Sequence, residues 1–221
     1  MPGSKPPRTE DFLPLQKDLF SLAKAAQSCR GCSLYLRATQ TVFGEGNATA
    51  RVVAVGEQPG DVEDQQGRPF VGPAGRVLDK ALAQAGLDRA SVYVTNAVKH
   101  FSFEERGKRR IHKKPRQSEV RACRPWLENE LEAIRPDVLL LLGATAAQAI
   151  FGPTFRVSQE RGQPIKSTLA PVVIATVHPS SILRAPDDAA REQAFQGLVA
   201  DLRVAARALE DLRRGGRPRV R

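Results

Sequence analysis

The sequence has no uninterrupted apolar run of the length that a membrane span requires, about 20 residues. Its first residues, MPGSKPPRTEDFLP, lack the apolar core of a signal peptide, and no segment is repeated along the chain. We therefore expect a cytoplasmic protein that makes no contact with membranes. Its 221 residues are enough for one domain with its own hydrophobic core.

Cysteine is also scarce, and an odd count of three argues against a disulfide framework. Cys29-x-x-Cys32 can bring two thiolates onto one ion or cluster, and Cys123 can supply a third ligand. His100 is the best candidate for a fourth ligand, because it follows the apolar run at 91–96 and precedes Cys123. The spacing leaves three interpretations open: an iron–sulfur cluster, a zinc site, or a redox dithiol with an unrelated Cys123.

Positive charge is concentrated in two short stretches. The net charge is +10, and residues 106–116 carry seven cations and no carboxylate, while residues 213–221 carry five arginines. Without these stretches the net charge would be −2, so a polyanion is the expected partner. We expect a disordered N-terminus at 1–11, a single domain at 12–212 and a basic disordered tail at 213–221.

Strands and helices are predicted to alternate along the chain. Short apolar runs predict buried strands at 51–55, 91–96, 137–142 and 172–177. Periodic patterns predict helices at 13–27, 74–85, 117–134, 144–151 and 188–212. This order predicts an α/β fold, a three-layer αβα sandwich around a central, mainly parallel four-stranded sheet. Segment 98–116 has no periodicity and is expected to be an exposed loop.

Polar residues follow several of these strands. Glu57 and Gln58 come after the first strand, Asn96 ends the second, and His178 follows the fourth. Ligands of open parallel sheets bind beyond the carboxyl ends of the strands, so these side chains are expected to converge. Taken singly, each has a plain structural interpretation, either a turn residue or a cap of a strand end.

Together these residues suit a pocket for a nucleobase. The Asn96 amide can match an edge that presents a carbonyl beside an N–H, and Phe70 in a glycine-rich loop can stack on an extruded base. His178 can donate a hydrogen bond to a leaving group that becomes an anion, and the turn at Ser180 adds further donors. The alternative for Phe70 is a loop aromatic folded onto the core.

Five segments resemble the iron–sulfur branch, family 4, of the uracil-DNA glycosylase superfamily. They are 42-VFGEGN, 56-GEQPGDVED, 67-GRPFVGPAG, 93-YVTNAVKH and 178-HPSSILR, and the resemblance covers about 29–184. It implies a [4Fe-4S] cluster, a uracil pocket that includes Gly56 and Ser180, and DNA as the partner of a nucleoid-associated protein. His100 stands where the family has its third cysteine ligand.

Three departures from the family resemble its UdgX subgroup. They are His100, Gln58 after Glu57, and the inserted run 107-GKRRIHKKP. Members of the subgroup become covalently joined to DNA through the histidine of this run, so the resemblance implies that His112 bonds C1′ of the abasic site. A neutral ring nitrogen is needed for this attack, and nearby cations disfavour the imidazolium form.

The same cations, Arg109, Arg110 and Lys113 among them, are expected to hold DNA phosphates. Glu57 could accept the proton that His112 loses, if the two groups lie within hydrogen-bond reach.

The sequence therefore predicts a monomeric uracil-DNA glycosylase that prefers single-stranded DNA and stays attached to its product through His112. In this interpretation Glu57 and Gln58 shape the sugar side of the pocket. One alternative is an ordinary multiple-turnover glycosylase in which His112 is a bystander. The other is a non-enzymatic module that holds a metal and binds single-stranded nucleic acid.

Overall fold

The computed structural model describes residues 7–215 and has a five-stranded sheet in the order β2-β1-β5-β7-β6. The strands are β1 (Val52–Gly56), β2 (Val92–Asn96), β5 (Val138–Leu142), β6 (Pro164–Ile165) and β7 (Val172–Thr176). All neighbours pair in parallel except β6, which is antiparallel to β7. The four predicted parallel strands are confirmed, and the two-residue strand β6 corrects the predicted number of strands to five. Two residues that begin with proline are too short to show a strand pattern.

Helices cover both faces of the sheet, as the predicted sandwich requires. They are α1 (Leu19–Ala26), α2 (Asp61–Gln66), α3 (Pro73–Ala85), α4 (Gln117–Ile134), α5 (Ala144–Phe151), α6 (Val157–Glu160), α7 (Pro179–Leu183) and α8 (Asp188–Arg214). Short 3-10 helices lie at Thr9–Phe12, Ser33–Leu36 and Arg89–Ser91. The five helices predicted from periodicity are all present. Helix α1 begins later than predicted, because Asp18 caps it by accepting the backbone N–H of Ser21.

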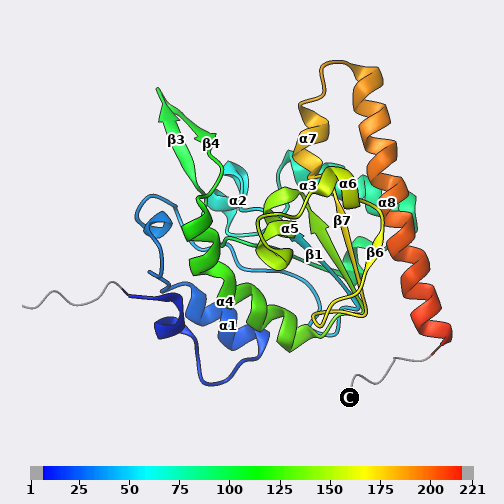
Figure 1. Ribbon diagram of the computed structural model, residues 1–221. Coiled ribbons are helices and arrows are strands. Elements are labelled where there is room, and N and C mark those ends of the chain that lie inside the picture. Colours follow the sequence, from blue (N-terminus) through cyan, green and yellow to red (C-terminus); the bar gives the residue numbers. More distant parts are fainter. Residues whose placement is uncertain (1–6, 216–221) are drawn as a thin grey trace, which may run out of the picture.

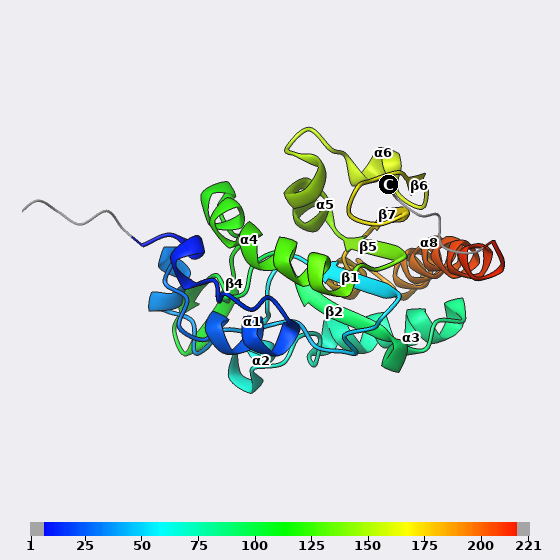
Figure 2. The same cartoon turned by 90° about the horizontal axis from the view of Figure 1, so that it is seen from below.

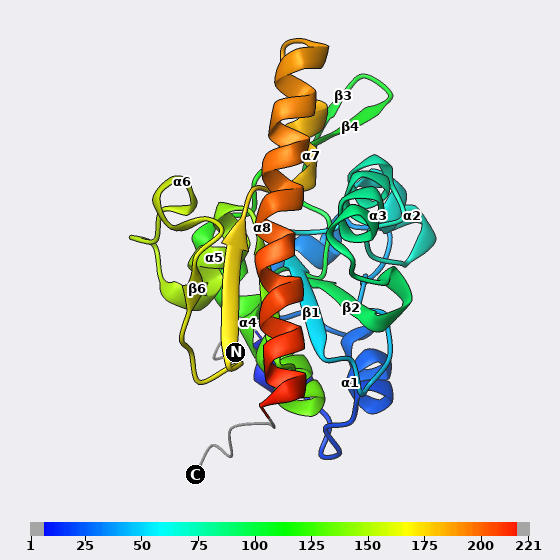
Figure 3. The same cartoon turned by 90° about the vertical axis from the view of Figure 1, so that its right-hand side faces the viewer.

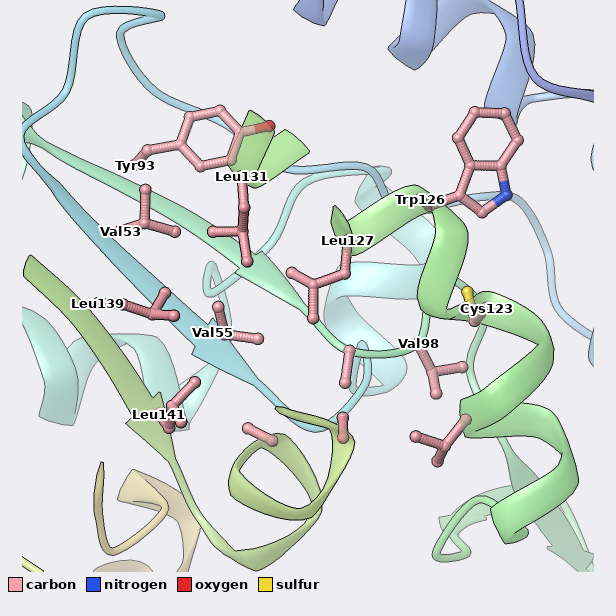
Figure 4. Packing of buried hydrophobic residues seen from close by; sticks show 14 of the residues in the cluster. Val53, Val55, Tyr93, Val98, Cys123, Trp126, Leu127, Leu131, Leu139 and Leu141 are labelled. Atoms are coloured by element: carbon pink, nitrogen blue, oxygen red, sulfur yellow. The ribbon is translucent and has the colours of Figure 1, made fainter. Parts of the chain in front are cut away.

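Two hydrophobic cores lie on the two sides of the sheet. Val53, Val55 and Leu141 point toward α1, α4 and α5, while Ala54 and Leu140 point toward α3 and α8. This alternation is the period of two that a strand imposes on its side chains. Figure 3 shows α8 in front of the sheet with α4 behind it. Figure 4 shows Val53 and Val55 of β1 beside Leu127 and Leu131 of α4. None of the helices described is long and apolar enough to cross a membrane.

The prediction of an exposed loop at 98–116 is wrong. Residues 98–103 are buried, and the chain then forms a hairpin of β3 (Phe103–Arg106) and β4 (Arg109–His112) that projects from the body (Figure 1). Gly107 takes a φ of 60° in the two-residue turn, as such tight turns require at their first position. The sequence does not reveal this hairpin, because its strands are mostly charged. A two-stranded ribbon exposed on both faces shows no hydrophobic alternation.

At both ends, ordered structure extends further than predicted. Thr9–Phe12 forms a 3-10 helix, and the buried Thr9 donates a hydrogen bond to the carbonyl of Ala122 in α4, so disorder is wrong for residues 9–11. Figure 2 shows this N-terminal segment beside α4. At the other end, α8 continues through Arg214. The remaining parts of both predictions, residues 1–6 and 216–221, lie outside the described residues.

Replacing Leu140 by alanine tests the central strand. Leu140 is 0% exposed in β5, so Leu140→Ala should lower the free energy of unfolding by about 2–5 kcal/mol, through lost burial and the cavity left behind. Urea denaturation followed by circular dichroism measures this loss. Leu36→Ala is the matched control, because Leu36 is 68% exposed and its truncation should change stability by less than about 0.5 kcal/mol. Equal losses in the two variants would contradict the assignment of the core.

Candidate functional site

A cleft of about 1210 Å³ opens at the carboxyl ends of the parallel strands. Of the residues predicted to form the site, seven line it: Glu57, Gln58, Phe70, Asn96, His112, His178 and Ser180. The hairpin and α7 rise on the same side of the sheet as the strand ends (Figure 1). The predicted convergence of strand exits is therefore what the structure shows, and His112 reaches the cleft from the hairpin.

Phe70 and Asn96 form the inner wall of the cleft, and both pack against Gly56. Gly56 lies at the end of β1, where an added Cβ would come within 2.7 Å of the Phe70 ring and would also collide with the Asn96 amide. Phe70 is buried and has a φ of 57°, which is strained for an aromatic residue. Gly75 follows in α3, where a Cβ would overlap the Phe70 carbonyl. This close packing holds an aromatic ring beside an amide, an arrangement that can stack on a planar ring and bond its edge.

His178 lies beside Phe70, at the start of α7, with the two ring centroids 6.3 Å apart. Its Nδ1 accepts a hydrogen bond of 3.1 Å from the backbone N–H of Ser180, and the hydroxyl of Ser180 lies 2.8 Å away. Because Nδ1 is the acceptor, the proton of the neutral ring is assigned to Nε2. Burial lowers the pKa of His178 to about 4, so the ring is neutral at pH 7. His178 is thus a neutral donor, which can stabilise an anion without first losing a proton.

The hydrogen-bond reach expected between Glu57 and His112 is present. His112 Nε2 lies 3.1 Å from Glu57 Oε1, and the two side chains are 52% and 20% exposed. The hydroxyl of Thr145 donates to the other carboxylate oxygen. Burial alone would raise the pKa of Glu57, but the hydrogen bonds from His112 and Thr145 outweigh it and lower this pKa below its usual value. Glu57 is therefore an ionised acceptor beside the imidazole.

Thr145 is a site residue that the sequence reasoning missed. It lies at the start of α5, directly after the third parallel strand, β5. The sequence 143-GATA, which follows β5, could have indicated this residue. Polar residues after the other parallel strands also reach the cleft, and Thr145 is the polar side chain in this segment.

Gln58 lines the cleft, and its amide has a further task that was not predicted. Its Nε2 donates to the carbonyls of Ser102 and Lys113, each at 3.0 Å, and its Oε1 accepts the N–H of Ser102 at 3.0 Å. These bonds join the two chain segments that flank the hairpin. The amide thus fixes the base of the element that carries His112.

Arg110 is also placed differently from the prediction. Its guanidinium is 21% exposed and bonds Asp61 and Asp64 of α2 at 2.6 Å, and it lies over the ring of Phe103. This charge is neutralised within the protein and is not available to hold a phosphate. By contrast, Arg109 and Lys113 are exposed, as the prediction of phosphate contacts requires.

The three cysteines are gathered on the side of α4 that faces the N-terminal segment. The indole N–H of Trp126 donates to Cys29 Sγ and the backbone N–H of Lys99 donates to Cys123 Sγ, both at 3.2 Å. Burial raises the pKa of Cys123 to about 12 and also raises that of Cys32, and the neighbouring thiols add to both effects. Within residues 7–215, no three His, Cys, Asp or Glu side chains are arranged to hold a single metal ion.

His100 lies beside the hydroxyl of Thr41, with Nε2 at 2.9 Å from Oγ1. That hydroxyl donates to the carbonyl of Ala26, so it accepts the Nε2 proton of His100 and leaves Nδ1 with the free lone pair. Burial lowers the pKa of His100 to about 4, which keeps the ring neutral. A neutral imidazole whose second nitrogen is held by a hydrogen bond is the usual state of a metal-binding histidine.

Comparison with known proteins gives a consistent result. Residues 43–203 match the family described as the uracil DNA glycosylase superfamily. The chain is 40% identical over 164 residues to a type-4 uracil-DNA glycosylase of Thermotoga maritima, covering 74% of this chain and 82% of that protein. It is 38% identical over 184 residues to a type-4 enzyme of Archaeoglobus fulgidus, covering 77% and 85%. With these matches and a cleft at the predicted place, the chain belongs to the uracil-DNA glycosylase superfamily.

Proposed function

We propose that this protein excises uracil from DNA and becomes covalently linked to C1′ of the resulting abasic site through His112. The observation that carries the covalent step is the 3.1 Å contact between His112 and Glu57 at the edge of the cleft. The names of its type-4 relatives support the excision step. The three departures that resemble the UdgX subgroup support the covalent one.

Uracil recognition is proposed for the inner wall of the cleft. Phe70 stacks on the extruded base, and the buried amide of Asn96 bonds its carbonyl and N–H edge. His178 donates its Nε2 proton to the uracil oxygen on which negative charge develops as the base leaves. Because the donor is neutral and fixed by Ser180, no proton transfer is required before the bond breaks.

The covalent step then follows from the position of His112. The bond between C1′ and N1 of uracil breaks, and its electron pair leaves with the base. One ring nitrogen of His112 donates its lone pair to C1′, and the proton of the other nitrogen passes to the Glu57 carboxylate. In an ordinary glycosylase water takes the place of the imidazole.

DNA contacts are proposed for the exposed cations around this cleft. Arg109 and Lys113 on the hairpin side are free to bind phosphates, and Lys114 lines the cleft itself. Single-stranded DNA is the preferred substrate, since its bases are already unpaired. We propose that the protein acts as a monomer in the cytoplasm, associated with the nucleoid.

We propose that Cys29, Cys32, His100 and Cys123 hold a [4Fe-4S] cluster that has a structural role. The N–H···S bonds to two of the sulfurs and the free Nδ1 of His100 suit such ligands. The thiols of Cys29, Cys32 and Cys123 also lie near enough to influence one another's pKa. When bound, the cluster would join the N-terminal segment to α4 and to the chain after β2.

An ordinary, multiple-turnover glycosylase is the second candidate. It is favoured by the identity of 40% to a protein named a type-4 uracil-DNA glycosylase. In that case the contact between Glu57 and His112 would only orient an attacking water.

A denaturing gel separates the two candidates. The protein, mixed with a labelled single-stranded oligonucleotide containing one uracil and then boiled in SDS, should give a shifted band that is absent when thymine replaces uracil. Only a covalent bond survives these conditions. No shifted band, together with strand cleavage after alkali, would establish the ordinary glycosylase. If neither signal appears, the excision step itself is refuted and the nucleic-acid-binding module remains.

Removing the imidazole should restore ordinary turnover. His112→Gly leaves space at the mouth of the cleft for water, so the covalent band should disappear and uracil released should exceed the amount of protein. Uracil release under excess substrate is the measurement. Glu104→Gly is the matched control, because Glu104 lies in the other strand of the hairpin and should keep the covalent band. A His112→Gly protein without abasic product would refute the proposed role of His112.

The proposed cluster predicts iron and sulfide in the purified protein, with visible charge-transfer absorbance. Cys123→Ser should lose most of this iron and unfold at a lower temperature, because ligand binding and folding are coupled. Glu128→Ser in the same helix is the control, since this side chain is 45% exposed and only pairs with Arg124. Metal analysis that finds zinc would replace the cluster by a zinc site. If the purified protein contains no metal and is fully stable, the redox dithiol is the remaining interpretation of the cysteines.

A further inference from the structure

A buried ion pair lies directly behind the inner wall of the cleft. Lys99 is 1% exposed and Glu130 of α4 is 0% exposed, and the ammonium of Lys99 bonds one carboxylate oxygen of Glu130. Lys99 Nζ also donates to Thr95 Oγ1 at 2.6 Å and to the backbone carbonyl of Asn96 at 2.8 Å. Tyr93 donates its hydroxyl to the other carboxylate oxygen at 2.8 Å.

Stability alone is a poor explanation for this pair. A buried ion pair has to overcome the cost of removing two charges from water, and well-packed apolar residues often serve a fold as well. The alternative explanation is that the pair specifies one conformation of the chain around it. The backbone carbonyl that the Lys99 ammonium bonds supports this explanation. It belongs to Asn96, the residue proposed to bond the uracil edge.

The bend after β2 connects this pair to the catalytic turn and to the cysteines. Within it, Ala97 N–H donates to the carbonyl of Gly56 at 2.9 Å, and Val98 N–H donates to that of Glu57 at 3.0 Å. The backbone N–H of Lys99 donates to Cys123 Sγ at 3.2 Å. One short bend thus bonds the end of β1, the turn that carries Glu57, and a proposed cluster ligand.

We propose that Lys99 is a positioning residue for uracil recognition, which locks the bend after β2 so that the Asn96 amide faces the base. Through its backbone N–H the same residue couples the cysteine site to the uracil pocket. This inference rests on the proposed function, in which the Asn96 amide forms hydrogen bonds with the edge of uracil. It gives Glu130, which does not itself line the cleft, the task of holding Lys99 in place.

The test uses two variants and a matched control. Lys99→Met removes the ammonium, and Lys99→Met combined with Glu130→Gln also removes the carboxylate charge, so that the core stays neutral and Tyr93 keeps an acceptor. Arg51→Met is the control. Arg51 forms an ion pair with the buried Asp137 at the amino end of the same sheet, away from the cleft. Each protein is characterised by its melting temperature and its iron content.

Affinity for free uracil, measured by titration calorimetry, is the decisive measurement, because it requires the base pocket but neither DNA binding nor chemistry. Both Lys99 variants should bind free uracil about tenfold more weakly, the effect of losing about one well-formed hydrogen bond. Affinity for a uracil-free oligonucleotide should be unchanged. The affinity of Arg51→Met for free uracil should equal that of the unaltered protein, even if its melting temperature falls as far as that of the double variant.

The outcomes separate this inference from the proposed function. If the unaltered protein releases uracil and the folded double variant binds free uracil equally well, Lys99 is only structural and the inference is overturned. A loss of uracil affinity in Arg51→Met that matches its loss of stability would overturn it too. If the unaltered protein neither releases nor binds uracil, the proposed function fails first.

Discussion

The register between β1 and β2 is the constraint on which the site depends. Parallel pairing places Gly56 opposite Asn96, so the turn after one strand and the amide that ends the next meet at one point. Because Gly56 has no side chain, the Phe70 ring and the Asn96 amide can approach the backbone at this point. A slip of one residue would turn every side chain of a strand to the opposite face. Because every residue of β1 and β2 is buried, such a slip would disrupt the packing on both faces of the sheet. The two cores therefore maintain the register that forms the cleft.

The hairpin of β3 and β4 shows how a basic run becomes a precise element. Its charges alone would favour an extended, mobile segment. Gln58 bonds both of its flanking segments, and Arg110 ties it to the carboxylates of α2 while stacking over Phe103. These interactions use one cation for structure and leave Arg109 exposed. The imidazole of His112 is consequently held against Glu57 by the protein before any DNA is bound.

The polar groups around the cleft owe their charge states to their surroundings. His178 is neutral because it is buried, whereas Glu57 stays ionised because two hydrogen bonds outweigh its burial. A neutral donor and an ionised acceptor thus line one cleft, which suits the departure of an anion and the removal of a proton. Behind them, the buried pair of Lys99 and Glu130 sets the path of the chain that links this cleft to the cysteines.

The sequence by itself determined the parallel sheet, the five long helices and the convergence of Glu57, Asn96 and His178, because strand and helix periods and strand exits are local patterns. It also determined the superfamily, since the motifs are contiguous. Only the tertiary structure decided the tasks of Gln58 and Arg110, the part played by Thr145, and the hairpin itself. The three side chains depend on partners far away in the chain: Asp61 and Asp64 for Arg110, Ser102 and Lys113 for Gln58, and Glu57 for Thr145. The hairpin is local, but its charged residues show no hydrophobic alternation. A side chain's partner is fixed by packing, which no local pattern records.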